Sequence, residues 1–435
     1  MTGERRAAAP SWYLLFVVTL ILVVAMIDRL SLTLLVEPIK GDLHISDVQM
    51  SMLLGLSFAL PFSAFGLPAG YLVDKYPRRL LMAVGGTIWS VMTIASGLAP
   101  SFAWLFVCRA GLGLGEAILS PCAYSMIRDA FPARQHAMAY GLHNSGGPLG
   151  AGLALIVVGQ LSGINSIHLP DGLSALATWR FALCAIGLAS FAAILLLISV
   201  REPARGVDPV EGARDGENVK ATARYLWARW PIYISVFSAT GLFGIASLSI
   251  GVWLPTGLSR LFEQPVEAIS QPLGLIQIIA PIIGLGLAII TLTTTLRKAP
   301  ISSAGFIGAL AMILSAIALT TAIFAPSMKV TWMAIAVLAF LHPWIGVVAA
   351  TILAWFTPSR MMGKVSAINF LMMGFVGMAG GPTLISVIAL VLFAGPSAIA
   401  YAIVVGAGTA YLLAAVALCG AGFGSGKKNP LNVTS

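Results

Sequence analysis

Long apolar stretches alternate with short polar segments along the whole chain. Twelve of these stretches contain the roughly 20 predominantly apolar residues that a helix needs to cross the hydrocarbon core of a membrane. Their approximate boundaries are 12–36, 50–73, 79–98, 102–127, 138–163, 177–200, 230–259, 270–296, 300–325, 330–356, 364–392 and 396–423. Runs such as 191–200 lack the strict alternation of a membrane β-strand. The pattern predicts an all-α polytopic membrane protein with 12 transmembrane helices.

One long polar segment interrupts this pattern in the middle of the chain. Residues 201–229 carry six basic and five acidic side chains, and six apolar stretches lie on either side. Such symmetry is typical of transporters built from structural repeats. We therefore expect a six-helix bundle over 1–200, a cytoplasmic linker over 201–229 and a second six-helix bundle over 230–435. A coincidence of loop length is the alternative.

Composition excludes several classes of function. Apolar residues make up 58% of the chain, charged residues 9%, and the mean hydropathy is +0.94, whereas soluble proteins contain about 25% charged residues. This excludes a soluble enzyme, a nucleic-acid-binding protein and a disordered scaffold. The net charge of +9 comes from short basic clusters between apolar stretches. With the N-terminus inside, 19 of the 25 Lys and Arg fall on the cytoplasmic side, so we expect both termini to be cytoplasmic and the protein to lie in a cell inner membrane.

Four charged residues lie well inside the predicted spans, away from their ends: Asp28, Arg29, Arg109 and Glu116. A charge at the centre of a membrane helix costs at least about 2.5–3.5 kcal/mol, so such residues usually face a cavity and find partners. At about 1.5 Å per residue, Asp28 and Arg109 lie at a similar depth and could pair. Glu116 follows Arg109 by seven residues, on nearly the same helix face. We expect all four side chains along one wall of one cavity.

These charges allow two interpretations. In the first, Asp28 and Glu116 carry protons, while Arg29 and Arg109 are their charge partners or bind an anionic substrate. Burial favours a protonated carboxyl group, and a nearby arginine favours the ionised form. Moving the arginine onto a substrate would therefore change the proton affinity of the acid. In the second interpretation, the four residues form a static network that holds helices together.

The histidines and cysteines give weaker indications of function than the four charged residues. His342 precedes Pro343 in the tenth span, where a kinked helix could expose it to substrate, or it could be a buried histidine with a local partner. His143 and Asn144 could line the cavity from the cytoplasmic side or be structural. All four cysteines lie in apolar spans without paired spacing. We expect no metal site and no cofactor.

Two motifs resemble signatures of the major facilitator superfamily. The loop after the second span is similar to its Gly-x-Leu-x-Asp-Arg-x-Gly-Arg-Arg signature, with Lys75 and Pro77 as departures. The fourth span is similar to the Arg-x-x-x-Gly-x-Gly-Glu-Ala signature of its proton-coupled branches, from Arg109 to Ala117. Glycines at this spacing let helices approach closely. The loop motif predicts a reversible conformational latch formed by Gly70, Asp74, Lys75, Arg78 and Arg79. The alternative is a basic turn that only sets the topology.

Two branches of that superfamily share these features: Spinster-like lipid transporters and anion:cation symporters for sugar acids. The finer sequence resembles Spinster more, in Glu37-Pro38 after the first span, in Trp89 and in Ser120-Pro121. The resemblance implies two pseudo-symmetric six-helix bundles around a cavity open to alternate faces. It also implies that Asp28 and Glu116 are protonation sites, and that Arg29 and Arg109 are charge partners or headgroup ligands.

The sequence therefore predicts a proton-coupled secondary transporter of an amphiphilic lipid, such as a lysophospholipid or a sphingoid phosphate. The alternative is a proton-coupled symporter of small organic anions such as sugar acids. Apolar residues of the seventh span favour the lipid. We expect a monomer whose partners are protons and its substrate, not nucleic acid. A membrane enzyme is not expected, because the intramembrane acids lie close to arginines and zinc-protease, serine-hydrolase and ATP-binding motifs are missing.

Overall fold

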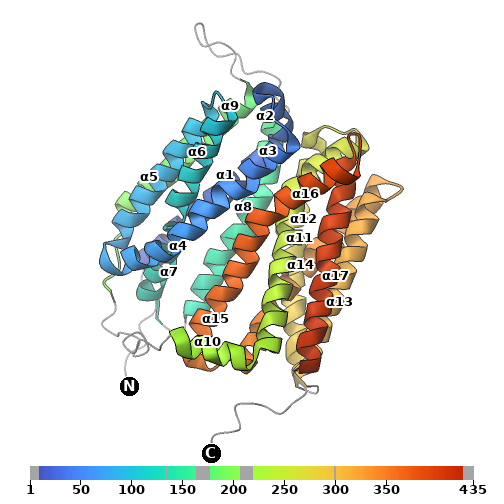
Figure 1. Cartoon of the computed structure of the whole chain (residues 1–435). Helices are drawn as coiled ribbons and strands as arrows, with labels where there is room; N and C mark the ends of the chain where they lie inside the picture. The colour runs from blue at the N-terminus through green and yellow to red at the C-terminus, as the bar shows by residue number, and fades with distance from the viewer. Residues whose placement is uncertain (1–8, 133–134, 163–176, 206–218, 298–299, 425–435) are drawn as a thin grey trace, which may run out of the picture. The chain divides into compact units, whose positions relative to one another are not determined.

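A computed structural model describes residues 9–132, 135–162, 177–205, 219–297 and 300–424. Within these ranges the chain is helical and contains no β-strand. Each of the twelve stretches predicted to span the membrane coincides with helix in the described part (Figure 1). Eleven helical segments there are long and apolar enough to cross a membrane, and α8 (His136–Ser162), which covers the fifth stretch, is not among those eleven. The prediction of an all-α polytopic protein is confirmed.

The chain divides into two compact units. The first contains the described residues within 1–207 together with 263–278, and the second contains those within 208–262 and 279–435. The boundaries expected at 200 and 230 stay a prediction, and residues 206–218 of the expected linker lie outside the described residues. The end of that linker forms a short helix, α10 (Val219–Ala228), which belongs to the second unit.

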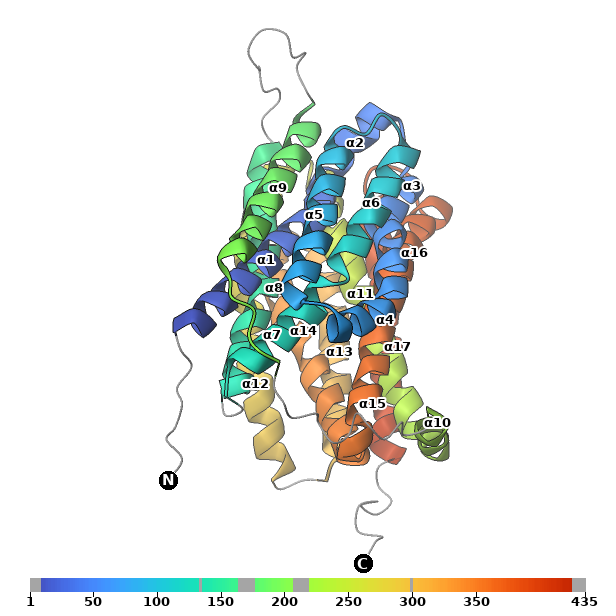
Figure 2. The ribbon, with the colours of Figure 1, turned by 90° about the vertical axis from the view of Figure 1, so that its left-hand side faces the viewer.

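Transmembrane helices of the first unit pack mainly in four pairs: α1 with α8, α5 with α9, α5 with α6, and α4 with α6. Figures 1 and 2 both show α5, α6 and α9 running side by side. The helices of this unit, apart from α8 and the first part of α12 (Val266–Leu296), are α1 (Ala9–Leu34), α2 (Val36–Leu43), α3 (Asp47–Ser51), the π-helical turn η1 (Met52–Leu56), α4 (Ser57–Lys75), α5 (Arg78–Gly97), α6 (Phe102–Glu116), α7 (Leu119–Ala130), α9 (Thr178–Leu195) and the 3₁₀ turn η3 (Leu196–Ser199).

In the second unit, α17 packs against α11 and α13, while α14 packs against α13 and α16 against α11. A π-helical turn, η4, joins α15 to α16, as η1 joins α3 to α4. The helices of this unit, apart from α10, are α11 (Trp230–Phe262), the later part of α12 (Val266–Leu296), α13 (Ser302–Ile323), α14 (Met328–Phe356), α15 (Ser359–Leu371), η4 (Met372–Val376), α16 (Gly377–Leu392) and α17 (Ala398–Gly424).

Glycines bring α5 and α6 into close contact, as the motif predicts. A Cβ atom on Gly115 would lie 2.5 Å from the carbonyl oxygen of Gly85, and one on Gly85 would lie 2.7 Å from that of Gly115. Only glycine fits two backbones at this distance. On its other side, α6 touches α4, where a Cβ on Gly113 would lie 2.6 Å from the carbonyl oxygen of Phe58. This packing fixes the position of Glu116, the last residue of α6.

Candidate functional site

Asp28 of α1 lies in a fully buried polar position, with 1% of its surface exposed. The indole Nε1 of Trp89 donates a hydrogen bond of 2.5 Å to its Oδ2 atom, and the hydroxyl of Thr93 donates to the same oxygen. Both donors come from α5 and are one helical turn apart. Hydrogen bonds of this kind hold the carboxyl group in one orientation.

The guanidinium of Arg109 faces the other oxygen of Asp28. Its Nη1 lies 3.9 Å from Oδ1, and both side chains are 1% exposed. The pairing expected from their depth is therefore present. The distance is too long for a hydrogen bond, and no nitrogen of the guanidinium has a hydrogen-bond partner among the described residues. The centre of the guanidinium lies 5.9 Å from the ring of Phe58, close enough for a cation–π contact.

A second ion pair connects the same two helices. Nη2 of Arg29 in α1 lies 2.8 Å from Oε2 of Glu116 in α6. Arg29 also lies over the rings of Phe58 and Phe62, at 4.5 Å and 5.5 Å. Glu116 is 3% exposed and Arg29 is 22% exposed. The other carboxylate oxygen of Glu116 has no partner among the described residues, so the acid depends on this one arginine.

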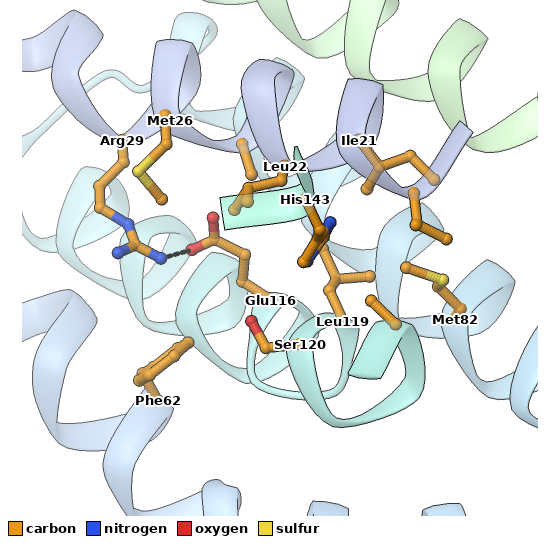
Figure 3. Close-up of a pocket in the computed structure, with 13 residues that line it drawn as sticks. Ile21, Leu22, Met26, Arg29, Phe62, Met82, Glu116, Leu119, Ser120 and His143 are labelled. Carbon is orange, nitrogen blue, oxygen red and sulfur yellow. Dashed lines mark hydrogen bonds and ion pairs between the residues drawn. The ribbon is translucent and has the colours of Figure 1, made fainter. Parts of the chain in front are cut away.

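The second ion pair borders a cavity of about 120 Å³ in the first unit (Figure 3). Arg29, Glu116, Ser120 and His143 provide its polar atoms. The rest of the wall is apolar: Val18, Ile21, Leu22, Ala25, Met26, Phe62, Met82, Leu119 and Ala123. Asp28 and Arg109 do not line this cavity, in contrast to the expectation of one wall carrying all four charges. Asp28 and Arg29 are consecutive, so they point about 100° apart around the helix, and Asp28 faces α5 instead.

Sequence reasoning identified the four charges but missed several of their partners. In the sequence, Trp89 supports only the resemblance to Spinster. A buried indole N–H needs a hydrogen-bond partner, however, and this need points to a buried acid. Phe58 and Phe62, which cover the arginines, gave no signal beyond their apolar character. His143 lies in the cavity wall, and its Nδ1 atom is buried without a partner among the described residues.

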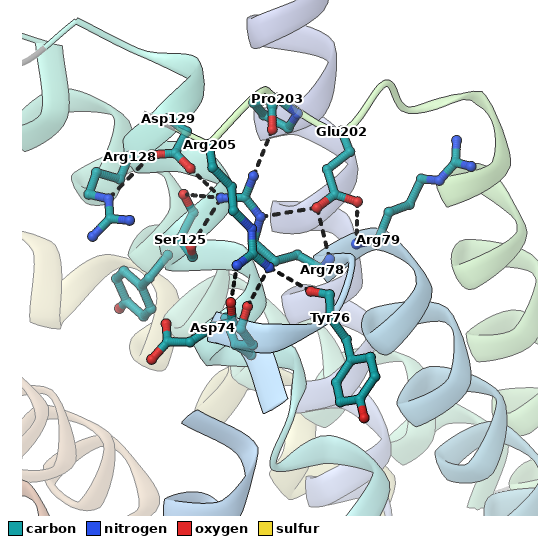
Figure 4. A network of polar contacts seen from close by, with 12 residues as sticks. Asp74, Tyr76, Arg78, Arg79, Ser125, Arg128, Asp129, Glu202, Pro203 and Arg205 are labelled. Carbon is teal, nitrogen blue, oxygen red and sulfur yellow. Dashed lines mark hydrogen bonds and ion pairs between the residues drawn. The ribbon is translucent and has the colours of Figure 1, made fainter. Parts of the chain in front are cut away.

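The predicted latch residues lie at the ends of α4 and α5, where Arg78 forms the centre of a polar cluster (Figure 4). Arg78 is 1% exposed. Its guanidinium donates to Ser125, to the carboxylate of Asp129, to Oε1 of Glu202 at 3.2 Å and to the carbonyl of Pro203 at 2.7 Å. We call these five residues the Arg78 cluster. It ties α5 to α7 and to the segment after η3.

Glu202 accepts three hydrogen bonds in all, and they explain its ionisation. Burial acts to raise the pKa of Glu202. Hydrogen bonds from the backbone and guanidinium of Arg78 and from the backbone of Arg79, together with the positive charge of Arg78, outweigh burial and hold this pKa below its ordinary value. The carboxylate is therefore ionised in the cluster at neutral pH.

The other latch residues make weaker contacts. The carboxylate of Asp74 is exposed and has no hydrogen bond or ion pair with any described residue, while its backbone carbonyl accepts from Arg205. Lys75 lies near the rings of Tyr71 and Tyr76, at 5.8 Å and 5.7 Å. Arg79 donates to the carbonyl of Val200 at 3.1 Å. No described atom would lie within 4 Å of a Cβ on Gly70.

His342 belongs to α14 in the second unit and does not line the cavity of the first. Its Nε2 lies 2.7 Å from the hydroxyl of Tyr411, and its ring packs edge-on against Phe243 at 5.4 Å. Of the two interpretations given for this histidine, a partnered side chain describes its state in this structure.

The proteins similar to this chain are membrane transporters. The family model described as Major Facilitator Superfamily matches residues 17–382. Protein spinster homolog 1 of Xenopus tropicalis is 29% identical over 238 residues, which are 54% of this chain and 43% of that protein. The hexuronate transporter of Bacillus subtilis (strain 168) is 32% identical over 140 residues, which are 32% of this chain and 33% of that protein. The matches thus span less than half the length of these relatives.

A solved structure agrees over almost the whole chain. It is a bacterial homolog of the human lysosomal transporter Spinster in an inward-facing, unoccupied conformation. Its TM-score is 0.80 at 21% identity, and the alignment covers 97% of this chain and 98% of that one. This similarity shows the fold. The Major Facilitator Superfamily consists of transporters rather than enzymes. Because the family model covers most of the sequence, this multi-pass membrane protein belongs to the Major Facilitator Superfamily, as its two motifs predict, and it resembles the Spinster proteins within it.

Proposed function

We propose that the protein is a proton-coupled secondary transporter that moves an amphiphilic lipid with an anionic headgroup by alternating access. The observation that carries this proposal is the Arg29–Glu116 ion pair at the wall of an otherwise mostly apolar cavity. The proposed working unit is a monomer. The proposed location is a cell inner membrane. The distribution of Lys and Arg supports cytoplasmic termini.

Coupling follows from competition for Arg29. An anionic group of the substrate that binds Arg29 displaces Glu116, whose only ion pair among the described residues is with that arginine. A carboxylate that loses its ion pair in a mostly apolar cavity takes up a proton more readily, from the side to which the cavity is open. Binding of the anion and binding of the proton therefore favour each other, and this mutual effect is reciprocal. When the substrate leaves, Arg29 pairs with Glu116 again and the proton is released.

Asp28 and Arg109 form a second pair of an acid with an arginine. This pair is more deeply buried than the pair of Arg29 and Glu116. The guanidinium of Arg109 has no hydrogen-bond partner among the described residues and is held by a 3.9 Å ion pair. We propose that Asp28 is the second protonation site and that protonation frees Arg109 to attract the substrate's charge. Trp89 and Thr93 keep the carboxyl group in place in either state.

The chemistry of the cavity wall bears on the substrate class. A sugar acid needs several hydroxyl and amide partners, whereas Ser120 and His143 are the neutral polar residues of this wall. At about 120 Å³ the cavity is smaller than the roughly 300–1,000 Å³ of typical ligand sites, so it holds a headgroup and a lipid tail lies beyond it. His342 is the proposed contribution of the second unit to substrate binding. Similarity to a hexuronate transporter keeps a small organic anion as the second candidate.

We further propose that Gly70, Asp74, Lys75, Arg78 and Arg79 form a latch that closes and opens during the cycle. The support is the Arg78 cluster, in which one buried guanidinium joins three segments of the first unit. Such a cluster has two discrete states, made or broken, which is what a conformational switch requires. The exposed carboxylate of Asp74 is available to a partner in the other state.

Proton movement into liposomes tests the coupling. The wild-type protein is reconstituted with an internal pH dye, and a lysophospholipid below its lytic concentration, or a sugar acid, is added outside. Glu116→Gln removes the titrating group at nearly constant volume and should abolish the substrate-dependent pH change while the protein stays folded. The matched control is Glu263→Gln, which changes an exposed acid outside the cavity wall and should leave the signal intact.

Each outcome decides between the candidates. A pH change with lysophospholipid that Glu116→Gln abolishes supports the lipid substrate and the role of Glu116. The same response to the sugar acid alone assigns the small-anion function and keeps the coupling mechanism. Proton movement of wild-type size in Glu116→Gln refutes Glu116 as a coupling residue, whichever substrate is used.

A further inference from the structure

Helix α10 and the start of α11 present an exposed aromatic and basic surface on the second unit. Trp227 is 79% exposed and Trp230 is 58% exposed, and neither has a hydrogen-bond or ring partner among the described residues. Arg224 is exposed as well and makes no ion pair there. We call Arg224, Trp227, Arg229 and Trp230 the α10 surface. The two exposed indoles are three residues apart and lie beside exposed or partly exposed arginines, which distinguishes this surface from the purely apolar faces of the spanning helices.

The inner face of α10 is fixed to the protein. The hydroxyl of Tyr225 donates a 2.7 Å hydrogen bond to the carbonyl of Phe356, which also accepts from Tyr233 at 3.0 Å. Thr222, one turn earlier, is buried. Because Thr222 and Tyr225 face inward, Arg224 and Trp227 face outward on the same short helix, as their exposure shows. The exposure of these side chains is therefore a feature of a docked helix.

Three observations place this surface at the depth of a membrane–water boundary. Phe356 is the last residue of α14, a helix long and apolar enough to cross the membrane. Trp230 is the first residue of α11, a second such helix. Trp355, also at the end of α14, is 43% exposed. Tryptophan gathers at this boundary, because its ring is apolar while its N–H can bond to headgroups and water.

The charge of the surface specifies the lipid. Residues 219–262, which form α10 and α11, contain no Asp or Glu, so Arg224 and Arg229 have no counter-charge within these helices. The guanidinium of Arg229 lies 4.2 Å from the centre of the Tyr225 ring, which holds it beside the indoles. Basic side chains at this depth attract anionic phospholipid headgroups, and tryptophans beside them insert among the upper acyl chains.

We propose that the α10 surface is a binding site for anionic phospholipid headgroups, which anchors α10 flat on the membrane surface where α11 begins. The two arginines bind the phosphates, and Trp227 and Trp230 enter the boundary between headgroups and acyl chains. The site is separate from the cavity of the first unit. Lipid binding at this site does not depend on the substrate or on proton coupling. The proposal can therefore be tested separately from the proposed function.

The experiment measures how deeply α10 lies in vesicles of defined lipid. A full-length chain with its four cysteines replaced carries a single spin label at Ala223→Cys, an exposed position on the same side of α10 as Trp227. It is reconstituted into phosphatidylcholine, with or without one quarter phosphatidylglycerol. Collision of the label with oxygen, which is concentrated in lipid, is compared with collision with a water-soluble nickel chelate.

With phosphatidylglycerol present, we expect the label to be accessible to oxygen and shielded from the chelate, and to move toward water in phosphatidylcholine alone. Removing one arginine by Arg224→Gln should weaken the phosphatidylglycerol-dependent part about fivefold. Trp227→Ser should return the label to water in both lipids. Arg128→Gln, an exposed arginine at the end of α7, is the matched control and should change nothing.

Three results would overturn the proposal. A label open to the chelate in every lipid means that α10 stands in water. Equal depth with and without phosphatidylglycerol means that the surface does not select anionic lipid. A label shielded from both reagents means that protein, a second copy or another segment, covers the surface instead.

Discussion

The buried pair of Asp28 and Arg109 allows a quantitative test of what the intramembrane charges contribute to stability. At 3.9 Å and an effective dielectric constant of about 20, two opposite charges attract by about 4 kcal/mol. Removing one partner of a buried pair costs about 3–5 kcal/mol in general, since the other charge stays buried. Asp28→Asn should therefore destabilise the protein by about 3–5 kcal/mol, even though Trp89 and Thr93 can still donate to the amide oxygen.

The two single changes should differ, and the double change should reveal the coupling. Arg109→Met should cost less than Asp28→Asn, because the carboxyl group can escape its buried charge by taking up a proton and keeps its two donors. The double variant removes both charges, so it should lie within about 1 kcal/mol of the wild-type protein. A coupling free energy of at least about 2 kcal/mol is expected.

Equilibrium unfolding in mixed micelles, followed by tryptophan fluorescence, gives these free energies. The matched control is Asp42→Asn, which breaks a 2.8 Å ion pair with Arg180 whose acid is 37% exposed. Exposed pairs contribute at most about 1 kcal/mol. If Asp28→Asn were no more destabilising than this control, or if the two single effects simply added in the double variant, the pair would not be the stabilising interaction that its geometry suggests.

Three further predictions concern the Arg78 cluster and the helix contacts. Arg78→Gln removes the buried guanidinium that pairs with Asp129, which is 5% exposed, and leaves this acid only the exposed Arg128 as a counter-charge. It should cost up to about 3–5 kcal/mol in the same unfolding assay and slow transport, and a neutral effect on both would exclude a latch. The pKa of Glu202 is lowered in the folded protein, so this carboxylate contributes its full stabilisation at pH values above the ordinary pKa of 4.5. The contribution is lost as pH falls through the lowered pKa. Glu202→Gln should therefore reduce the loss of stability at acid pH in a stability–pH profile, and an unchanged loss would contradict this. Gly115→Ala places a Cβ 2.5 Å from a carbonyl oxygen of α5 and should cost about 1–3 kcal/mol, whereas Gly141→Ala, with no described atom within 4 Å, should cost far less.

Much of the fold followed from local pattern. The length and apolarity of each stretch predicted its helix, because a segment in hydrocarbon must satisfy its backbone internally wherever it packs. The four intramembrane charges were found the same way, since their cost in lipid makes them conspicuous in any arrangement. Depth arithmetic also predicted the pairing of Asp28 with Arg109, because rise per residue is a property of one helix.

The partners of these charges depended on tertiary structure. Arg29 and Glu116 are 87 residues apart. Which acid pairs with which arginine depends on how each helix is rotated about its axis. The apolar pattern of a span does not indicate this rotation when every side of the helix is apolar. The hydrogen bonds of Trp89 and Thr93 to Asp28 join residues 61 and 65 apart. The docking of α10 on Phe356 likewise joins residues 131 apart. The sequence alone determined which residues must be buried in the membrane and at what depth; the tertiary structure decided what each of them faces, because contacts between helices are set by rotation and packing rather than by local pattern.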